Sequence, residues 1–329
     1  MKHRNISLFV PHLGCPHTCI FCNQRAISGK VSALREEDIA SACRTAMNGS
    51  FSISESELAF FGGSFTAIDR RLMQSYLEEA GKYLGKCYSG IRISTRPDCI
   101  DEEILTILKN YGVSAIELGA QSMCCDVLEK NERGHTPEDT VRAAELIKSF
   151  GFSLGLQMMT GLYGSDDEKD IYTAESFIAL RPDTVRIYPT VVLENTALAR
   201  LYREGKYTPP SLDASVRLCA RLLLMFHNES IRVIRLGLHS GGGVEEGFIA
   251  GVYHPAFREL AESEIYKNIT EEKLSPLPDG EYHLAVHPKE LSKMLGQKRS
   301  NVEYFRSKGK HIRVTGDDTL SQYNVLLYI

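Results

Sequence analysis

The sequence predicts an α/β fold: a partial (βα)6 barrel of the TIM type, followed by a small C-terminal α+β domain. Apolar segments of strand length alternate with segments of helix length from residue 5 to residue 236, which indicates parallel βα units. Motifs rich in cysteine, glycine or polar residues follow the strand ends, where such barrels collect their chemistry. The alternation stops near residue 240, where Gly241, Gly242 and Gly243 indicate a break.

Local signals support each element in turn. The first strand is a short apolar run, and the third alternates along its length. One helix opens at Asp101 and is closed by Gly112, and another has Pro137 at its start and Gly151 at its stop. The expected strands are 5–10, 58–61, 90–95, 115–118, 152–159, 184–188 and 231–236, and the expected helices are 35–48, 69–84, 101–111, 137–150, 167–180 and 212–227.

The composition is that of a soluble globular protein, with 43% hydrophobic and 24% charged residues. The formal net charge of −4 excludes a general attraction for polyanions, so any contact with nucleic acid must come from a local patch. No apolar run approaches the ~20 residues of a membrane span, and the N-terminal apolar stretch is too short for a signal peptide. Unpaired cysteines without an export signal indicate the reducing cytoplasm.

Three cysteines, Cys15, Cys19 and Cys22, stand at the spacing C-x3-C-x2-C in a polar loop after the first strand. Iron–sulfur clusters are held by cysteine thiolates, and three thiolates leave one iron of a 4Fe–4S cluster open for another ligand. A structural zinc site, with His12 or His17 as fourth ligand, is the alternative. The isolated cysteines are expected to be core residues: Cys43, Cys87, Cys99 and Cys219.

This spacing, with the aromatic Phe21 directly before the third cysteine, resembles the signature of the radical S-adenosylmethionine (radical SAM) enzymes. The resemblance implies that Cys15, Cys19 and Cys22 ligate a 4Fe–4S cluster whose open iron chelates S-adenosylmethionine. It implies cleavage of S-adenosylmethionine to a 5′-deoxyadenosyl radical, and an electron donor such as ferredoxin or flavodoxin.

Other strand ends carry further candidates. Gly62 and Gly63 allow a ligand to approach the backbone closely, although they also suit a simple turn. Arg133 suits a carboxylate, because a guanidinium can hold one bidentately. The resemblance implies that Gly62 and Gly63 contact the amino group of S-adenosylmethionine, and that Gln121, Arg133 and Gln157 contact its ribose and carboxylate. Ser64, where an acidic residue is frequent, and Arg96 complete the expected cofactor set.

Several segments also resemble the catalytic subunit of Elongator and its bacterial relatives, over roughly residues 5–240. They are Ile93-Ser94-Thr95-Arg96-Pro97-Asp98, Glu117-Leu118-Gly119-Ala120-Gln121-Ser122, Asn131-Glu132-Arg133-Gly134-His135-Thr136, Ile187-Tyr188-Pro189-Thr190, Gly205-Lys206-Tyr207 and Ile231-Arg232-Val233-Ile234-Arg235. A weaker parallel is with oxygen-independent coproporphyrinogen oxidase. We expect the chain to have no room for the acetyltransferase domain of that subunit and to lack its N-terminal extension for tRNA. Ser94 replaces a glutamate that often holds a ribose hydroxyl. The resemblance therefore implies the cluster and cofactor chemistry, and not carboxymethylation of uridine.

We divide the chain into a barrel (1–240), a linker with a helical extension (241–280) and a small basic α+β domain (281–329). In the extension, 256–264 is an expected helix and 275–280 a link. The last domain is expected as strand 282–286, helix 288–295, helix 301–307 and strands 311–314 and 323–329. Its turn Gly296-Gln297-Lys298-Arg299 resembles the GxxG loop of KH modules without the second glycine. Gly296, Lys298 and Arg299 are thus candidate RNA contacts; a solvated basic face is the alternative.

The favoured function is that of a radical SAM enzyme acting on tRNA or another RNA. The alternative is a non-catalytic protein that binds the cluster and S-adenosylmethionine and delivers haem, through His135, His239 or His254, or binds RNA. Cys124 and Cys125 are not expected to share a metal, because adjacent side chains on a helix point apart.

Overall fold

The computed structural model describes residues 4–10, 15, 18–23, 34–48, 52–238 and 244–328. Among the residues discussed above, His12, His17, His239 and Gly241–Gly243 lie outside the described part of the chain.

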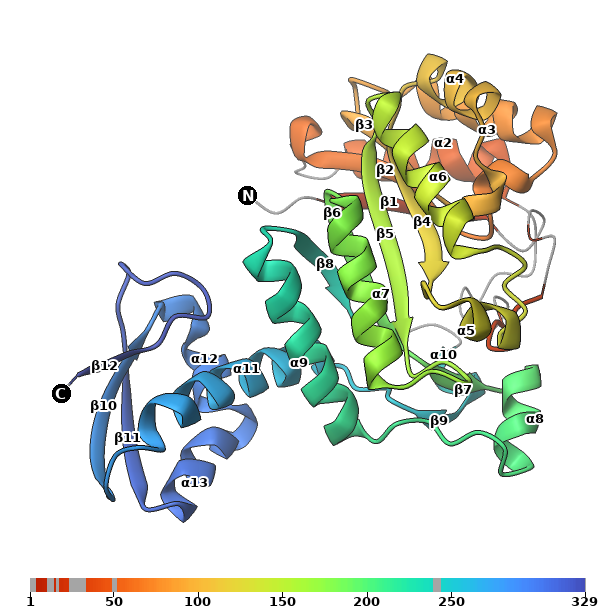
Figure 1. Ribbon diagram of the computed structural model, residues 1–329. Coiled ribbons are helices and arrows are strands. Elements are labelled where there is room, and N and C mark those ends of the chain that lie inside the picture. The colour runs from red at the N-terminus through yellow and green to blue at the C-terminus, as the bar shows by residue number, and fades with distance from the viewer. Residues whose placement is uncertain are drawn as a thin grey trace.

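A single sheet of seven parallel strands forms the larger part of the molecule (Figure 1). Its order follows the sequence, β1-β2-β3-β4-β5-β6-β8. The sheet curls without closing, so the predicted partial barrel is confirmed. The strands are β1 (Arg4–Val10), β2 (Ser56–Gly62), β3 (Gly90–Thr95), β4 (Val113–Gln121), β5 (Ser153–Thr160), β6 (Thr184–Pro189) and β8 (Arg232–Leu236).

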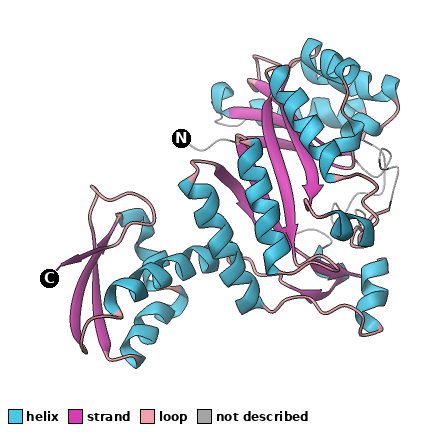
Figure 2. Cartoon of the chain, viewed as in Figure 1, coloured by secondary structure: helices cyan, strands magenta, loops and turns pink. Residues whose placement is uncertain are grey.

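Helices cover one face of this sheet (Figure 2). Side-chain caps fix where the helices begin: Asp69, Asp101 and Thr136 each accept hydrogen bonds from N–H groups of the first turn. The helices of this part are α2 (Glu36–Met47), α3 (Arg70–Gly81), α4 (Glu102–Asn110), α5 (Cys125–Lys130), α6 (Pro137–Ser149), α7 (Asp167–Leu180), α8 (Ala197–Arg203) and α9 (Leu212–Asn228). No helix in the described ranges is both long and apolar enough to cross a membrane.

Strand β4 runs further than the predicted 115–118. It continues through Gly119 to Gln121, with a shift in its pairing to β5 between Leu118 and Gln121. Gln121 has a left-handed φ of 69°. Because of this irregularity, the alternation of apolar and polar residues does not show where the strand ends. The small antiparallel sheet of β7 (Val191–Leu193) and β9 (Phe248–Gly251), preceded by α10 (Val244–Gly247), was not predicted either, because its strands are so short.

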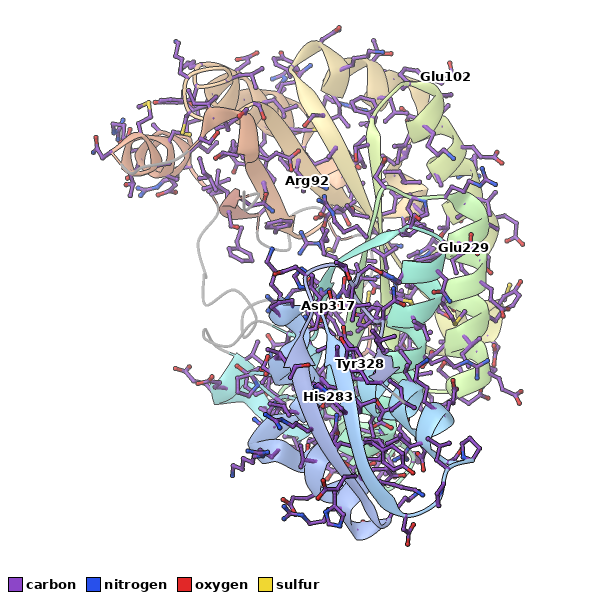
Figure 3. All side chains as sticks on the ribbon, turned by 90° about the vertical axis from the view of Figure 1, so that its left-hand side faces the viewer. Arg92, Glu102, Glu229, His283, Asp317 and Tyr328 are labelled. Atoms are coloured by element: carbon purple, nitrogen blue, oxygen red, sulfur yellow. The ribbon has the colours of Figure 1, made fainter. Side chains whose placement is uncertain are left out.

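The C-terminal residues form a second, three-stranded sheet with helices on one face (Figure 1). Its order is β11-β10-β12, with β10 parallel to β11 and antiparallel to β12. Figure 3 shows His283 and Tyr328 on this sheet, well separated from Arg92 on the large one. The elements are α11 (Phe257–Leu274), β10 (Gly280–Val286), α12 (Leu291–Leu295), α13 (Ser300–Ser307), β11 (Lys310–Gly316) and β12 (Leu326–Tyr328).

Two predicted bounds in this region were wrong. Helix α11 continues for about ten residues beyond the expected end at 264, and it packs against both α9 and α12. The last strand starts at Leu326 rather than 323, because Tyr323 has a left-handed φ of 62° and donates its N–H to the hydroxyl of Tyr266. One apolar core connects the large sheet, α11 and the small sheet. The division at residues 240 and 280 stays a prediction.

Asn301 joins these C-terminal elements, since its buried amide donates to Ser263 O, Ser263 Oγ and Met294 O. We expect Asn301→Ala to lower the free energy of unfolding by about 1–3 kcal/mol, because these oxygens lose their donor. Asn301→Asp should cost more, because a carboxylate would face the carbonyl oxygens of Ser263 and Met294 and could donate to neither. Thermal or denaturant unfolding measures both, with the exposed Asn324→Asp as control. Equal stability of Asn301→Asp and the wild type would contradict the assignment.

Candidate functional site

A cavity of about 470 Å³ lies at the carboxyl ends of the strands. Parallel strands that end at one edge bring segments far apart in sequence to the same place. All eleven residues predicted to hold the cluster or the cofactor line this cavity: Cys15, Cys19, Phe21, Cys22, Gly62, Gly63, Ser64, Arg96, Gln121, Arg133 and Gln157.

The segment of the cysteines is held from two sides. The N–H of Ile20 donates to Asn131 O at 3.3 Å, and Ile20 O accepts from the N–H of Leu198 in α8 at 2.8 Å. The N–H of Cys22 donates to Cys19 O at 3.0 Å, which closes a turn. Phe21 packs in a small apolar cluster with residues of β7 and α8. The described part of the loop is therefore fixed against the β4–α6 connection and the β7–β9 sheet.

Gly62 and Gly63 end β2 beside the end of β1. Gly62 has a φ of +108°, and a Cβ there would lie 2.7 Å from Val10 O. The N–H of Gly63 donates to the same carbonyl oxygen at 2.8 Å. Only glycine fits position 62, for its backbone angle and for this close approach. Ser64 follows, buried, with its Oγ 3.9 Å from Cys15 Sγ.

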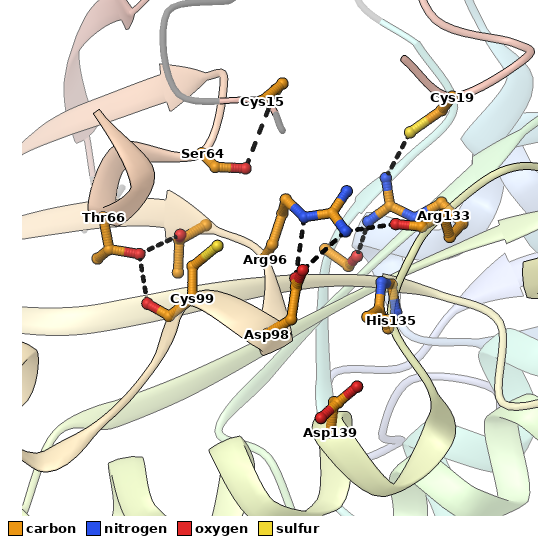
Figure 4. A network of polar contacts seen from close by, with 12 residues as sticks. Cys15, Cys19, Ser64, Thr66, Arg96, Asp98, Cys99, Arg133, His135 and Asp139 are labelled. Carbon is orange, nitrogen blue, oxygen red and sulfur yellow. Dashed lines mark hydrogen bonds and ion pairs between the residues drawn. The ribbon is translucent and has the colours of Figure 1, made fainter. Parts of the chain in front are cut away.

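Two buried arginines connect the cavity to the β3 and β4 strand ends (Figure 4). Arg96 donates to both carboxylate oxygens of Asp98, at 2.9 and 3.0 Å, and to the carbonyl of Arg133. Arg133 Nη1 donates to Cys19 Sγ at 3.0 Å, and its Nη2 donates to Gly119 O. Arg96 is therefore no solvated surface arginine. The two guanidinium groups join the cysteine segment to the sheet.

Gln121 and Gln157 lie on neighbouring strands, and Gln157 Nε2 donates to Gln121 Oε1 at 3.2 Å. Sequence reasoning missed a third polar residue that lines the cavity beside these glutamines, Glu117. The two-residue period of a strand could have found it, because every second residue of β4 from Glu117 to Gln121 lines the cavity. Glu117 also pairs in register with Ser94 of β3, another residue of the lining.

Glu117 is the centre of a buried ion network. Arg92 Nη1 lies 3.2 Å from Glu117 Oε1 and Arg92 Nε 2.8 Å from Glu57 Oε2. Arg186 Nη2 donates to Glu117 Oε1 at 2.9 Å, and its Nε lies 2.7 Å from Oε2 without the alignment of a hydrogen bond. A Cβ on Gly155 would come within 2.8 Å of Glu117 Cγ, so this glycine makes room for the carboxylate.

The residues present suit an iron–sulfur cluster. Three cysteines without a disulfide line one cavity, and Arg133 Nε is buried there without a hydrogen-bond partner. Within the described part of the chain, no three ligand side chains converge on a point, as those of one ion would. A four-iron cluster takes one thiolate on each of three irons, so its ligands lie apart.

The four isolated cysteines were predicted to be core residues, and three of them, Cys43, Cys87 and Cys219, are buried. Burial raises the pKa of the Cys43 and Cys219 thiols to about 12, which makes them inert at neutral pH. Cys99 is only partly buried, yet burial still raises its pKa to about 11.

Two of the three histidines proposed for haem, His135 and His254, make hydrogen bonds within the protein, and the third, His239, lies outside the described residues. His135 is buried and its Nε2 contacts Ala120 O at 3.2 Å. His254 Nδ1 accepts the N–H of Ala256 at 3.1 Å.

The basic face expected in the C-terminal region is smaller than the sequence suggests. Of the seven Lys and Arg side chains that made this region look basic, four form ion pairs. Lys293 pairs with Glu262 and Glu290, Arg306 with Glu303, Lys308 with Glu271, and Lys310 with Asp279. Lys298, Arg299 and Arg313 have no ion pair among the described residues and are exposed. Lys298 and Arg299 have left-handed φ values of 53° and 65°. Neither lines the cavity.

Comparison with protein families decides the class of this site. The radical SAM superfamily matches residues 9–176, which is about half of the chain, and the radical SAM C-terminal domain matches residues 182–267. The chain belongs to the radical SAM superfamily. This radical SAM protein is therefore an enzyme whose cofactors are a 4Fe–4S cluster and S-adenosylmethionine, and it requires a reductant.

Curated relatives of this radical SAM protein include tRNA uridine(34) acetyltransferase of Methanocaldococcus jannaschii, 36% identical over 179 residues, 46% of this chain and 32% of that protein. Human Elongator complex protein 3 is 32% identical over 196 residues, 53% of this chain and 36% of that protein. The match spans about a third of the length of these relatives. The resemblance to the Elongator subunit is thus confirmed.

Among solved structures, the fold is similar to that of Elp3 from the archaeon Methanocaldococcus infernus with residues 1–46 deleted. The TM-score is 0.67 at 19% identity, over 83% of this chain and 64% of that one. Methylornithine synthase gives a TM-score of 0.50 at 19% identity over 72% of each chain. At such identities the likeness shows the fold alone, and it confirms the predicted architecture.

His135 should make stability depend on pH. Burial, and then the charges of Arg133 and Arg96, lower its pKa to about 4, whereas the unfolded chain has a histidine pKa of about 6.5. As the pH falls from about 6.5 to 4, the unfolded state takes up a proton that the folded state excludes. The free energy of unfolding should fall by up to about 3 kcal/mol.

We expect His135→Gln to lose this dependence, and the exposed His311→Gln to keep it. Denaturant unfolding across this pH range measures the difference from the wild type. Asp170, whose pKa burial raises to about 7, contributes an opposite slope, which is common to all three proteins and cancels in the difference. Parallel curves for wild type and His135→Gln would contradict the prediction.

Proposed function

We propose that Cys15, Cys19 and Cys22 hold the 4Fe–4S cluster and leave one iron open for S-adenosylmethionine. The observation that carries this proposal is the shared cavity, which brings the three cysteines together with the Gly62–Gly63 backbone and the β4 and β5 glutamines. When bound, the reduced cluster supplies the electron that cleaves S-adenosylmethionine to the 5′-deoxyadenosyl radical. Ferredoxin or flavodoxin is the proposed electron donor.

The protein's own residues bind and orient the cofactor in this proposal. Gly62 and Gly63, which line the cavity, present backbone groups to the amino group of S-adenosylmethionine. Gln121 and Gln157, already joined by a hydrogen bond, face its ribose, and Arg133 with Arg96 supplies positive charge toward its carboxylate. Phe21 and Ser64 complete the enclosure, which keeps water from the reacting atoms.

We propose tRNA as the substrate. The relatives named above include a protein called tRNA uridine(34) acetyltransferase. The unpaired cations Lys298 and Arg299, with Gly296 before them, are the proposed RNA contacts, because such a turn can hold the phosphate backbone. The reducing cytoplasm is the proposed location, because none of the nine cysteines forms a disulfide.

Cluster binding is tested by replacing each of the three cysteines with alanine. Each variant should lose most of its iron and sulfide after anaerobic reconstitution, and should form no 5′-deoxyadenosine with dithionite and S-adenosylmethionine. Cys125→Ala, which removes an exposed cysteine outside the cavity, should match the wild type. A wild type that takes up iron and yet never produces 5′-deoxyadenosine would sink the proposal.

The substrate is tested by cross-linking and recovery of RNA bound in native cells. A defined tRNA should be enriched with the wild type and lost with Lys298→Glu/Arg299→Glu. In a filter-binding assay, the double variant should reduce the salt dependence of binding by roughly two phosphate contacts. The charge-matched control is Lys273→Glu/Arg232→Glu, at exposed positions elsewhere. Recovery of no specific RNA would instead indicate a small-molecule substrate.

A further inference from the structure

Arg133 makes a contact that binding of S-adenosylmethionine does not require. Its guanidinium donates from Nη1 to Cys19 Sγ at 3.0 Å (Figure 4), and both residues are buried, with exposed fractions of 6% and 7%. An arginine side chain can adopt many rotamers, so a buried and directed contact needs a fixed backbone and a fixed far end.

Both ends of Arg133 are fixed. Its N–H donates to Leu128 O at 3.0 Å, and its carbonyl accepts from Arg96, which is itself held by Asp98. At the far end, Nη2 donates to Gly119 O of β4. The guanidinium therefore reaches Cys19 from a scaffold built by two strand ends and one helix.

The charge of Arg133 is not neutralised locally. Its guanidinium forms no ion pair among the described residues, and the one carboxylate of this cluster, Asp98, is paired with Arg96. The two arginines and Asp98 together carry one net positive charge beside Cys19. In a buried position this charge acts on its neighbours with little screening.

We propose that Arg133 is a positioning residue that donates a charged hydrogen bond to the Cys19 thiolate and favours the reduced state of the cluster. The inference rests on the proposed ligation of the cluster by Cys19. Reduction adds one negative charge to the cluster, and a fixed cation bonded to a ligating sulfur stabilises the more negative state. Hydrogen bonds to the sulfurs and the net charge of the site set the reduction potential of such clusters.

This role differs from the predicted contact with the carboxylate of S-adenosylmethionine. Nη1 and Nη2 already donate to Cys19 and Gly119, which leaves the buried Nε as the nitrogen without a partner. The hydrogen bond from Arg133 to Cys19 acts on the cluster before S-adenosylmethionine binds. Its effect can therefore be measured apart from the carboxylate contact, in protein that has the cluster and no S-adenosylmethionine.

The test is the midpoint potential of the reconstituted cluster without S-adenosylmethionine, for wild type, Arg133→Gln and Arg133→Lys. We expect a more negative potential in Arg133→Gln, because the cation is lost, and a smaller shift in Arg133→Lys, which keeps a charge but cannot make both bonds. The electron paramagnetic resonance g values of the reduced cluster should change in parallel. Lys130→Gln removes an exposed cation paired with Asp126 near the same turn, and should leave potential and spectrum unchanged.

Iron content is measured first. Wild-type protein without a cluster would mean that the proposed function has failed, before this inference is tested. Iron-loaded variants with the wild-type potential, and with only a weaker affinity for S-adenosylmethionine, would overturn the inference and favour the carboxylate contact alone. If Arg133→Gln does not fold, the potential of Arg133→Lys decides by itself.

Discussion

The close approach of β2 to the end of β1 is the constraint on which the site depends. Val10 O accepts from the N–H of Gly63 and leaves no room for a Cβ at Gly62. This contact fixes the point where the chain leaves the first strand toward Cys15, and it places the glycine backbone at the same edge of the sheet. The other strands pair in parallel and in sequence order, so the ends of β3, β4 and β5 lie at that same edge. The proposed cluster ligands and the proposed surface for S-adenosylmethionine thus arise from one arrangement of strands.

Much of this arrangement could be predicted from sequence, because its signals are local. Apolar runs, the Asp101 cap, Pro137 and the stop glycines located strands and helices, and the strand-end rule grouped the predicted cofactor residues that line one cavity. The end of β4 could not be predicted in this way. The shift in its pairing with β5 and the left-handed φ of Gln121 interrupt the regular alternation on which the prediction relied.

Electrostatic partners were the least predictable feature. The lysines of the C-terminal region read as a basic surface, yet Lys293 pairs with Glu262 and Lys308 with Glu271, both on α11. Pairs that form between distant segments carry no periodic signal. The same reason hid the Cys19–Arg133 contact, whose partners are 114 positions apart in the chain. The sequence predicted both residues as part of the site and could not show that they touch.

The buried network around Glu117 has a consequence for how such a chain can diverge. Two arginines on different strands share this one carboxylate, and Gly155 leaves the space for it. Loss of the Glu117 carboxylate alone would leave Arg186 without its carboxylate partner and Arg92 with Glu57 alone. Substitutions at these positions should therefore be strongly epistatic. A side chain at position 155 becomes acceptable only after Glu117 has been replaced by a smaller residue.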